Sequence, residues 1–192
     1  MTVQQADFER AIEALRGGDL VVIPTDTVYG LAVDLGAPDG VRRVFEAKGR
    51  PEFRPLPVLA SSLTALDSVA ELDVAGRRLA ERYWPGPLTL VVRRAAGFET
   101  FLGQGGEETV AVRIPDHPIA LAILEATGPL AVTSANASGA QPAETVDAAR
   151  AALSDSVSLY VDAGPCSGAP STIVSLVGAP HVIRPGAVYI DL

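Results

Sequence analysis

The sequence predicts a single α/β domain over residues 1–192, built on a mixed sheet with flanking helices. Short apolar runs of strand length alternate along the chain with stretches of helical periodicity. Turns rich in glycine and proline separate them, and no internal repeat or interdomain linker interrupts the pattern. Of the 192 residues, 48% are hydrophobic, which is enough for one buried core and excludes wholesale disorder.

The first half of the chain gives four helices and three strands. Apolar residues at helical spacing over 8–15 predict a helix that Gly17-Gly18 ends, and the apolar run Leu20–Ile23 predicts a strand closed by Pro24. Pro38-Asp39 opens a second helix, which ends near Lys48. The other elements expected in this half are a strand at Leu56–Leu59, helices at Leu63–Val69 and Val74–Tyr83, and a strand at Leu88–Val92.

The second half begins with a glycine-rich surface loop, Ala95–Glu108, and continues with alternating elements. A strand at Val110–Ile114 precedes a helix at Pro118–Ala126, for which Asp116 is the expected cap. The remaining expected elements are a strand at Leu130–Thr133, a small-residue loop at Ser134–Gln141, a helix at Thr145–Leu153, and strands at Leu159–Val161, Thr172–Leu176 and Val182–Ile183.

Composition excludes several classes of protein. Lys+Arg is 15 and Asp+Glu is 23, so the formal charge is −8 and a broad electrostatic clamp for nucleic acid is not expected. Cys166 is the only cysteine and His117 and His181 are the only histidines, so neither a disulfide framework nor a multi-histidine metal centre can form. The charged N-terminal stretch is neither a signal peptide nor a membrane span, so we expect a cytoplasmic protein with no membrane partner.

Basic residues are distributed unevenly between the two types. Fourteen of the 15 are arginine, and Lys48 is the only lysine. In such a background, a lone lysine suggests a position where a compact, flexible ammonium is needed and a planar guanidinium does not serve. The other interpretation is that drift left it there.

Polar clusters follow several of the predicted strands, where ligands bind in open α/β sheets. Pro24–Gly30 combines two hydroxyls and a carboxylate, and is either a ligand site or a turn that caps itself. Lys48–Leu56 places three cations within seven residues stiffened by prolines, which suits a polyphosphate or carboxylate better than a solvated basic loop. Thr133–Gly139 offers hydroxyls, an amide and backbone N–H groups as a cradle for phosphate or nucleoside.

A buried-looking charge marks a further cluster. Alternation over Thr109–Pro115 puts Val110, Val112 and Ile114 on one face, and Thr109, Ala111 and Arg113 on the other. An arginine at such a position is paired in a structural salt bridge, solvated in a cleft, or bound to an anion. Ser171-Thr172 and Arg184-Pro185-Gly186 add hydroxyls and one more cation near later strands.

The chain lacks the common signatures of nucleotide binding and covalent catalysis. Neither a P-loop, a Rossmann glycine fingerprint nor a nucleophile elbow is present. The available side chains are threonines, serines, asparagine, lysine and arginines. Such residues act by positioning and electrostatic stabilisation, which is how nucleotidyl and phosphoryl transfer are catalysed.

Seven motifs in order resemble the YrdC/TsaC family of L-threonylcarbamoyladenylate synthases. Each is weak alone, and together they extend from about Gly18 to Gly186 and resemble the short single-domain members. The motifs are Pro24–Leu31 (PTDTVYGL), Lys48–Leu56 (KGRPEFRPL), Trp84–Thr89 (WPGPLT), Val112–Pro115 (VRIP), Thr133–Gly139 (TSANASG), Ser171–Val174 (STIV) and Ile183–Gly186 (IRPG).

This resemblance implies a fold, a reaction and partners. The fold would be a YrdC-like twisted mixed sheet flanked by helices, with a large concave cavity lined by basic residues. The reaction would join L-threonine, bicarbonate and ATP with Mg²⁺ to give L-threonylcarbamoyl-AMP and pyrophosphate, the first step of threonylcarbamoyladenosine modification of tRNA. Partner proteins would take the adenylate, so the chain itself would bind tRNA only weakly, if at all.

The resemblance also implies residue roles. Lys48 and Arg50 match the family's K-x-R pair and would be catalytic, neutralising charge on the phosphates and carbamate. The nucleotide would contact Arg50, Arg54, Thr109, Ser134, Asn136 and Arg184. Threonine would contact Thr27, Arg113, Thr133 and Ser171, with Arg113 on its carboxylate. No protein ligand to a metal is expected.

One departure from the family pattern concerns the amino acid. Many relatives carry a histidine after the K-x-R motif, where this chain has Leu59. Two alternatives therefore stay open besides the synthase. A family paralogue would use a different carbamoyl substrate, and its turnover would not depend on threonine. An RNA-binding module would bind RNA with a steep salt dependence and no turnover.

Overall fold

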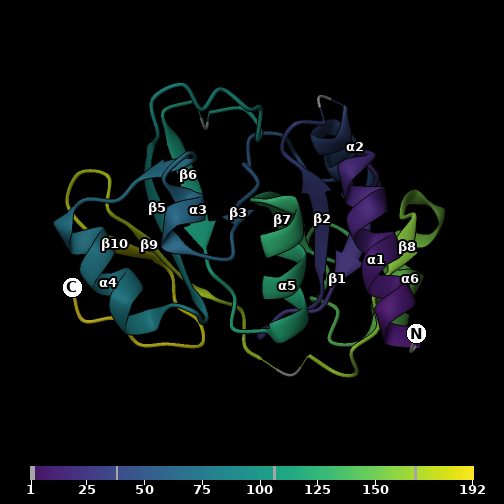
Figure 1. Ribbon diagram of the computed structural model, residues 1–192. Coiled ribbons are helices and arrows are strands. Elements are labelled where there is room, and N and C mark those ends of the chain that lie inside the picture. Colours follow the sequence, from purple (N-terminus) through teal and green to yellow (C-terminus); the bar gives the residue numbers. More distant parts are fainter. Residues whose placement is uncertain (1–2, 38, 106, 167) are drawn as a thin grey trace.

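Ten strands form one twisted mixed sheet in the computed structural model, which describes residues 3–37, 39–105, 107–166 and 168–192 (Figure 1). The strands are β1 (Val21–Ile23), β2 (Gly30–Asp34), β3 (Val58–Leu59), β4 (Ala70–Glu71), β5 (Leu88–Arg94), β6 (Thr109–Arg113), β7 (Leu130–Ser134), β8 (Leu159–Tyr160), β9 (Thr172–Ser175) and β10 (His181–Arg184). The helices are α1 (Val3–Arg16), α2 (Gly40–Lys48), α3 (Leu63–Leu66), α4 (Val74–Tyr83), α5 (Pro118–Thr127) and α6 (Val146–Leu153), with a short 3₁₀ turn at Ser154–Ser156.

The strand order is β10-β9-β5-β6-β3-β7-β2-β1-β8, with β4 paired to β5 outside this path. Three strand pairs are parallel (β1 with β8, β3 with β6, β5 with β9) and the others are antiparallel, so the prediction of a mixed sheet is confirmed. The central strand β3 has only two residues and joins two larger halves of the sheet.

Most elements lie where the hydrophobic pattern predicts them, with two kinds of difference. The strands β2 and β4 were not predicted. The helix α5 begins one residue later than a cap at Asp116 requires, because His117 is its N-cap and Pro118 its first residue. The expected cap at Asp116 is therefore wrong. Pro38 and Gly106, which fall in an expected helix start and loop, lie outside the described residues.

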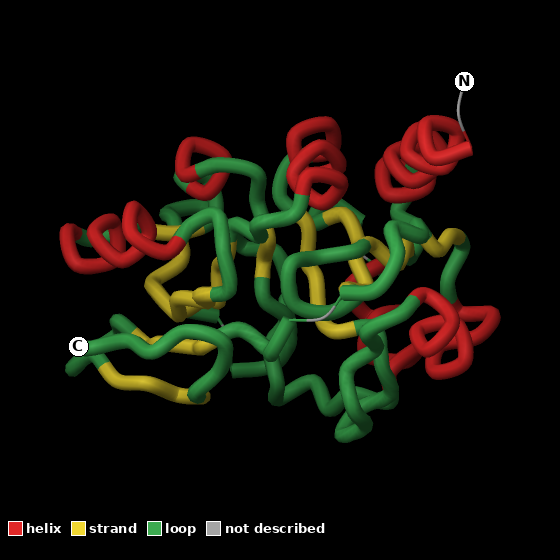
Figure 2. The backbone as a smooth tube through the Cα atoms, turned by 90° about the horizontal axis from the view of Figure 1, so that it is seen from below, coloured by secondary structure: helices red, strands yellow, loops and turns green. Residues whose placement is uncertain are grey.

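Helices cover the sheet through two apolar clusters. Ala11 and Leu15 of α1 pack with Ile123 and Leu124 of α5 against β1, β2 and β7. A larger cluster joins α2, α3 and α6 to strands of both halves of the sheet. Figure 2 shows a row of helices along one side of the strands, with the C-terminal end of the chain on the opposite side.

The segment between β8 and β9 links opposite halves of the sheet, because β8 is an edge strand and β9 lies near the other edge (Figure 1). Backbone contacts hold it against the β1–β2 connection, since Gly168 N donates to Thr27 O over 2.9 Å. The hydroxyl of Tyr29 donates to Gly164 O at 2.7 Å and accepts from Ala163 N at 3.1 Å. This close approach explains a glycine at 168: a Cβ there would lie 2.3 Å from Asp26 O and 2.7 Å from Thr27 Cα.

Replacing Gly168 with alanine should therefore force the two backbone segments apart. We expect Gly168→Ala to lower the free energy of unfolding by at least about 2 kcal/mol, as overpacking does. Gly97→Ala is the matched control, because Gly97 has φ of 84° and a Cβ added there would meet no atom within 4 Å, so its cost is only that of a left-handed residue, about 1 kcal/mol. Urea unfolding of both variants measures the difference, and equal costs would contradict this packing.

Candidate functional site

A cavity of about 480 Å³ opens over the middle of the sheet. Its wall takes residues from β3, β5, β6, β7, β9 and β10, together with the β1–β2 connection and the loop after α2. Thr109, Ala111 and Arg113 line it, whereas Val110 and Val112 are buried in the core. The alternation predicted for this strand is thus confirmed.

The cavity gathers most of the residues that sequence reasoning selected. Eight of them line it and come from six separate stretches of the chain: Thr27, Arg50, Thr109, Arg113, Thr133, Ser134, Ser171 and Arg184. Three selected residues do not line it: Lys48, Arg54 and Asn136. Residues that the sequence argument did not select also line it, among them Thr25, Thr89, Gly105 and Pro142.

Arg113 is the most constrained of the cavity arginines. Its Nη2 donates to Asp26 Oδ1 at 2.5 Å, its Nη1 to Thr27 Oγ1 at 3.1 Å, and its Nε to Gly86 O at 2.9 Å. Only 6% of the residue is exposed. Burial lowers the pKa of Arg113, and the charge of Asp26 opposes that shift. The salt-bridge interpretation of this arginine is therefore realised, and the same side chain also faces the cavity.

Asp26 lies behind Arg113 and is only partly satisfied. Its Oδ2 is buried without a hydrogen-bond partner among the described residues, as is Nδ1 of His117. The pKa of His117 is lowered, first by burial, against the opposing charges of Asp26 and Asp116, so its imidazole is neutral at pH 7. The sequence placed Asp26 in a polar cluster, but nothing in it could identify Arg113 as its partner 87 positions away.

A second hydroxyl and arginine cluster lies where β5, β9 and β10 meet. Ser171 Oγ and Thr89 Oγ1 are 2.9 Å apart, and Arg184 Nη2 donates to Ser171 O at 2.8 Å. The register between β9 and β10 shifts between Val182 and Arg184, so that Arg184 pairs with Ile173. Such a bulge re-aims a side chain, and here both Ile183 and Arg184 line the cavity.

Arg50 braces the loop that follows α2. Its Nε donates to Arg54 O at 2.9 Å and its Nη2 to Pro55 O at 3.2 Å, while the residue lines the cavity. Burial and the nearby charge of Arg54 lower the pKa of Arg50. Arg54 itself is exposed, with its guanidinium 5.9 Å from the ring centre of Phe53.

Lys48 is the last residue of α2 and is 4% exposed. Its Nζ donates to the backbone oxygens of Ser134 and Asn136 rather than facing the cavity. Its own carbonyl accepts from Ser138 N at 2.8 Å. Asn136 also serves the loop, because its Nδ2 donates to Ala137 O and Ala140 O, each at 2.9 Å.

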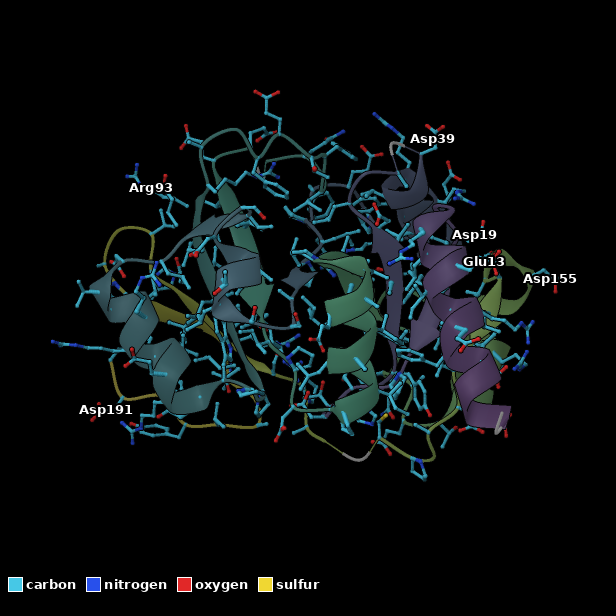
Figure 3. All side chains as sticks on the ribbon, viewed as in Figure 1. Glu13, Asp19, Asp39, Arg93, Asp155 and Asp191 are labelled. Atoms are coloured by element: carbon cyan, nitrogen blue, oxygen red, sulfur yellow. The ribbon has the colours of Figure 1, made fainter. Side chains whose placement is uncertain are left out.

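Charge is divided between the cavity and the outer surface. Of the described residues that line the cavity, three are arginines and none is acidic. Acidic side chains such as Glu13, Asp19, Asp39, Asp155 and Asp191 lie on the periphery of the molecule (Figure 3). A chain with net charge −8 can thus still hold a site for anions.

Two further searches of the described part of the chain bear on cofactors and membranes. No group of three His, Cys, Asp or Glu side chains there could hold a metal ion. None of the helices within it combines the length and apolar character that a membrane span requires.

The protein is thus an α/β protein with a twisted mixed sheet, and its cavity is lined by arginines and hydroxyls, which suit anionic ligands. The chain belongs to the Sua5/YciO/YrdC family: that family's model, described as "Telomere recombination", matches residues 13–186. The resemblance inferred from the seven motifs is confirmed.

Relatives and solved structures agree with this assignment. A Bacillus subtilis threonylcarbamoyl-AMP synthase is 34% identical over 192 residues, covering 98% of this chain and 56% of its own length. A Mycobacterium tuberculosis protein that bears the same name provisionally is 43% identical over 181 residues, covering 93% of this chain and 83% of its own. The crystal structure of Pyrococcus abyssi Sua5 complexed with L-threonine is 36% identical, with a TM-score of 0.89, over 97% of this chain and 56% of the other.

The buried ammonium of Lys48 should leave a signature in the pH dependence of stability. Burial first, and then the charge of Arg50, lower its pKa from 10.5 to about 8. Between these values the unfolded chain keeps a proton that the folded protein has released, so folding is increasingly favoured as pH rises through this window. The cost of burying the charge, on the order of 3 kcal/mol, is present below pH 8 and is relieved toward pH 10.5.

We therefore expect the free energy of unfolding of the wild type, minus that of Lys48→Met, to increase between pH 7.5 and pH 10. Urea unfolding at four pH values measures this difference, in which the titration of other groups cancels. A difference that stays flat or decreases would show that Lys48 is not desolvated as the structure indicates.

Proposed function

We propose that this chain is a threonylcarbamoyl-AMP synthase, which converts L-threonine, bicarbonate and ATP into L-threonylcarbamoyl-AMP and pyrophosphate. The observation that carries the proposal is a single cavity that collects three arginines and several hydroxyls in a member of this family. Relatives that match nearly the whole chain bear the name of that enzyme. The activity is that of a nucleotidyltransferase that binds ATP and serves tRNA modification.

The amino acid fits the part of the cavity around Arg113. Threonine brings a carboxylate, an amine and a hydroxyl, and here the guanidinium of Arg113 donates to the Thr27 hydroxyl and shares the cavity with the hydroxyls of Thr133 and Ser171. The geometry changes the expected contact of Arg113 in one respect. Each guanidinium nitrogen already donates to the protein, so a substrate carboxylate would use the second N–H of Nη1 or Nη2, with Asp26 holding the fork in place.

We assign the nucleotide to the other two arginines that line the cavity, Arg50 and Arg184. These two arginines carry charges for which no carboxylate partner lies within salt-bridge distance among the described residues. Thr109 and Ser134 offer hydroxyls on the same wall. We assign the triphosphate to the arginines and the rest of the nucleotide to the hydroxyls, whereas Arg54 and Asn136, which do not line the cavity, contribute through their loops.

The chemistry then needs positioning and charge neutralisation. Bicarbonate takes up a proton and loses water to give CO₂. The unprotonated threonine amine adds to the carbon of CO₂ and gives a carbamate, releasing one proton that balances the one taken up. A carbamate oxygen attacks the α-phosphorus of ATP, a new P–O bond forms, and the bond to the bridging oxygen breaks to release pyrophosphate. Arginines that face the phosphates stabilise the negative charge that develops on the leaving group.

Magnesium enters as part of the substrate. The described residues offer no group of three His, Cys, Asp or Glu side chains for a resident ion, and Asp26, a carboxylate next to the site, already pairs with Arg113. We therefore place Mg²⁺ on the triphosphate of ATP and assign it no protein ligand.

Several broader features of the proposal rest on the resemblance rather than on the cavity. The product would pass to partner proteins that transfer the threonylcarbamoyl group to tRNA, and the acidic outer surface gives the chain little affinity for tRNA itself. The chain would act as a single domain over residues 1–192 in the cytoplasm. It spans about half the length of the Bacillus and Pyrococcus relatives.

The decisive experiment is pyrophosphate release from ATP with Mg²⁺ and bicarbonate. We expect release to require L-threonine and to be at least about ten-fold slower with L-serine, since a pocket gains about 1–3 kcal/mol from one methyl group. Release that is indifferent to threonine would instead favour the family paralogue with another carbamoyl substrate. No release, together with salt-sensitive RNA binding, would favour the RNA-binding alternative.

Arg113 should affect the binding of threonine far more than that of ATP. Loss of a charge-assisted contact costs about 2 kcal/mol, so we expect the double variant Asp26→Asn/Arg113→Gln to raise the KM for threonine about 30-fold, with the KM for ATP changed less than about three-fold. Asp26→Asn removes the largely buried carboxylate that Arg113→Gln alone would leave without its ion-pair partner. Steady-state kinetics with each substrate varied in turn measures both constants. A rise in the KM for ATP alone would show that Arg113 contacts the nucleotide and not threonine.

A further inference from the structure

The chain's only lysine does not behave as a cation that faces the substrate. Lys48 is 4% exposed and does not line the cavity, although Arg50 two residues later does. Its Nζ lies against two backbone oxygens, those of Ser134 and Asn136. Two of the three N–H donors of the ammonium are therefore used on the protein itself.

The loop that these contacts hold is part of the cavity. Ser134 ends β7 and lines the cavity wall with its neighbour Thr133. Beyond it the chain turns back toward α2, where Ser138 N donates to Lys48 O at 2.8 Å. Lys48 thus contacts the 134–138 loop at three points, two through its side chain and one through its backbone.

The rest of the loop has few other anchors on the α2 side. Ala135 N donates to Tyr29 O at 2.8 Å, which ties the loop to the β1–β2 connection. The Asn136 side chain donates only within the loop, to Ala137 O and Ala140 O, and its Oδ1 is buried without a partner among the described residues. Ser134 is also held within β7, where it pairs with Gly30 of β2. Among the described residues, the hydrogen bonds that join α2 to the loop beyond this strand all involve Lys48.

We infer that Lys48 is a positioning residue, whose ammonium fixes the 134–138 loop through the carbonyls of Ser134 and Asn136 and so places Ser134 on the cavity wall. This inference rests on the proposed function for its catalytic consequence, but not for its structural part. It replaces the expectation that Lys48 neutralises the phosphates directly. It also explains a lysine in a chain otherwise supplied with arginine, because a compact ammonium fits between two carbonyls and a planar fork does not.

Hydrogen exchange in the ligand-free protein tests the structural part. We expect Lys48→Met to speed amide exchange over residues 134–140 at least about ten-fold, because opening of the loop becomes local and easy. Arg50→Met is the matched control: its guanidinium contacts the backbone oxygens of residues 54 and 55, so it should leave exchange over 134–140 unchanged. Lys48→Gln, whose amide NH₂ keeps an uncharged donor group, replaces the methionine variant if that protein does not fold.

A double-mutant cycle tests the catalytic part. Pyrophosphate release is measured for the wild type, Lys48→Met, Ser134→Ala and the double variant. If Lys48 acts by positioning Ser134, Lys48→Met lowers kcat/KM about 30-fold and most of that loss comes from the displaced Ser134. Adding Ser134→Ala then has little further effect, so the double variant is little worse than Lys48→Met. A direct contact with phosphate gives losses that multiply, and Lys48→Arg would then retain most of the activity.

The outcomes separate the two levels of the argument. Unchanged exchange over 134–140 in Lys48→Met, or losses that multiply in the cycle, overturns the positioning role. A wild type without threonine-dependent turnover overturns the proposed function instead, while the exchange measurement still decides whether Lys48 holds the loop.

Discussion

The guanidinium of Arg113 is the constraint on which the site depends. It projects from β6 in the middle of the sheet and donates to the carboxylate of Asp26, the hydroxyl of Thr27 and the carbonyl of Gly86. These three acceptors belong to two connections that are distant in sequence, so one side chain draws the β1–β2 connection and the turn before β5 to the same end of the sheet. Removing its charge would leave the Asp26 carboxylate without its ion-pair partner, although Oδ2 of this carboxylate already has no hydrogen-bond partner among the described residues. The same pair keeps an arginine at a cavity wall in one orientation before any substrate arrives.

The cations near the cavity divide into those that face it and those that support it. Arg113 and Arg184 line the wall, and Arg50 both lines it and braces its own loop. Lys48 is buried behind the wall. This division suits a site that must bind several anionic groups in fixed positions, because a side chain held by backbone carbonyls loses little further conformational entropy on binding.

The class of fold and most of the cavity residues could be predicted from the sequence, because they depend on the pattern of apolar and polar residues within each strand or helix. Alternation alone placed Thr109, Ala111 and Arg113 on one face, and they line the cavity together. It failed where the outcome depended on partners far away in the chain. The strand β2 begins at Gly30, the last residue of a cluster interpreted as either a ligand site or a turn, and it pairs with β7 about 100 positions later. Likewise, residue type marked Lys48 as special, but only the folded chain shows its ammonium on two carbonyls.

The bulge in β10 makes the direction of the Arg184 side chain depend on the number of residues in that strand. Arg184 reaches Ser171 because the strand gains an extra residue between Val182 and Arg184 relative to β9. Side chains alternate between the faces of a strand, so losing or adding one residue there would send the guanidinium to the outer side of an edge strand while leaving the sheet intact. Length variation in this short hairpin is therefore a route by which related chains could exchange one cavity charge for another without altering their fold.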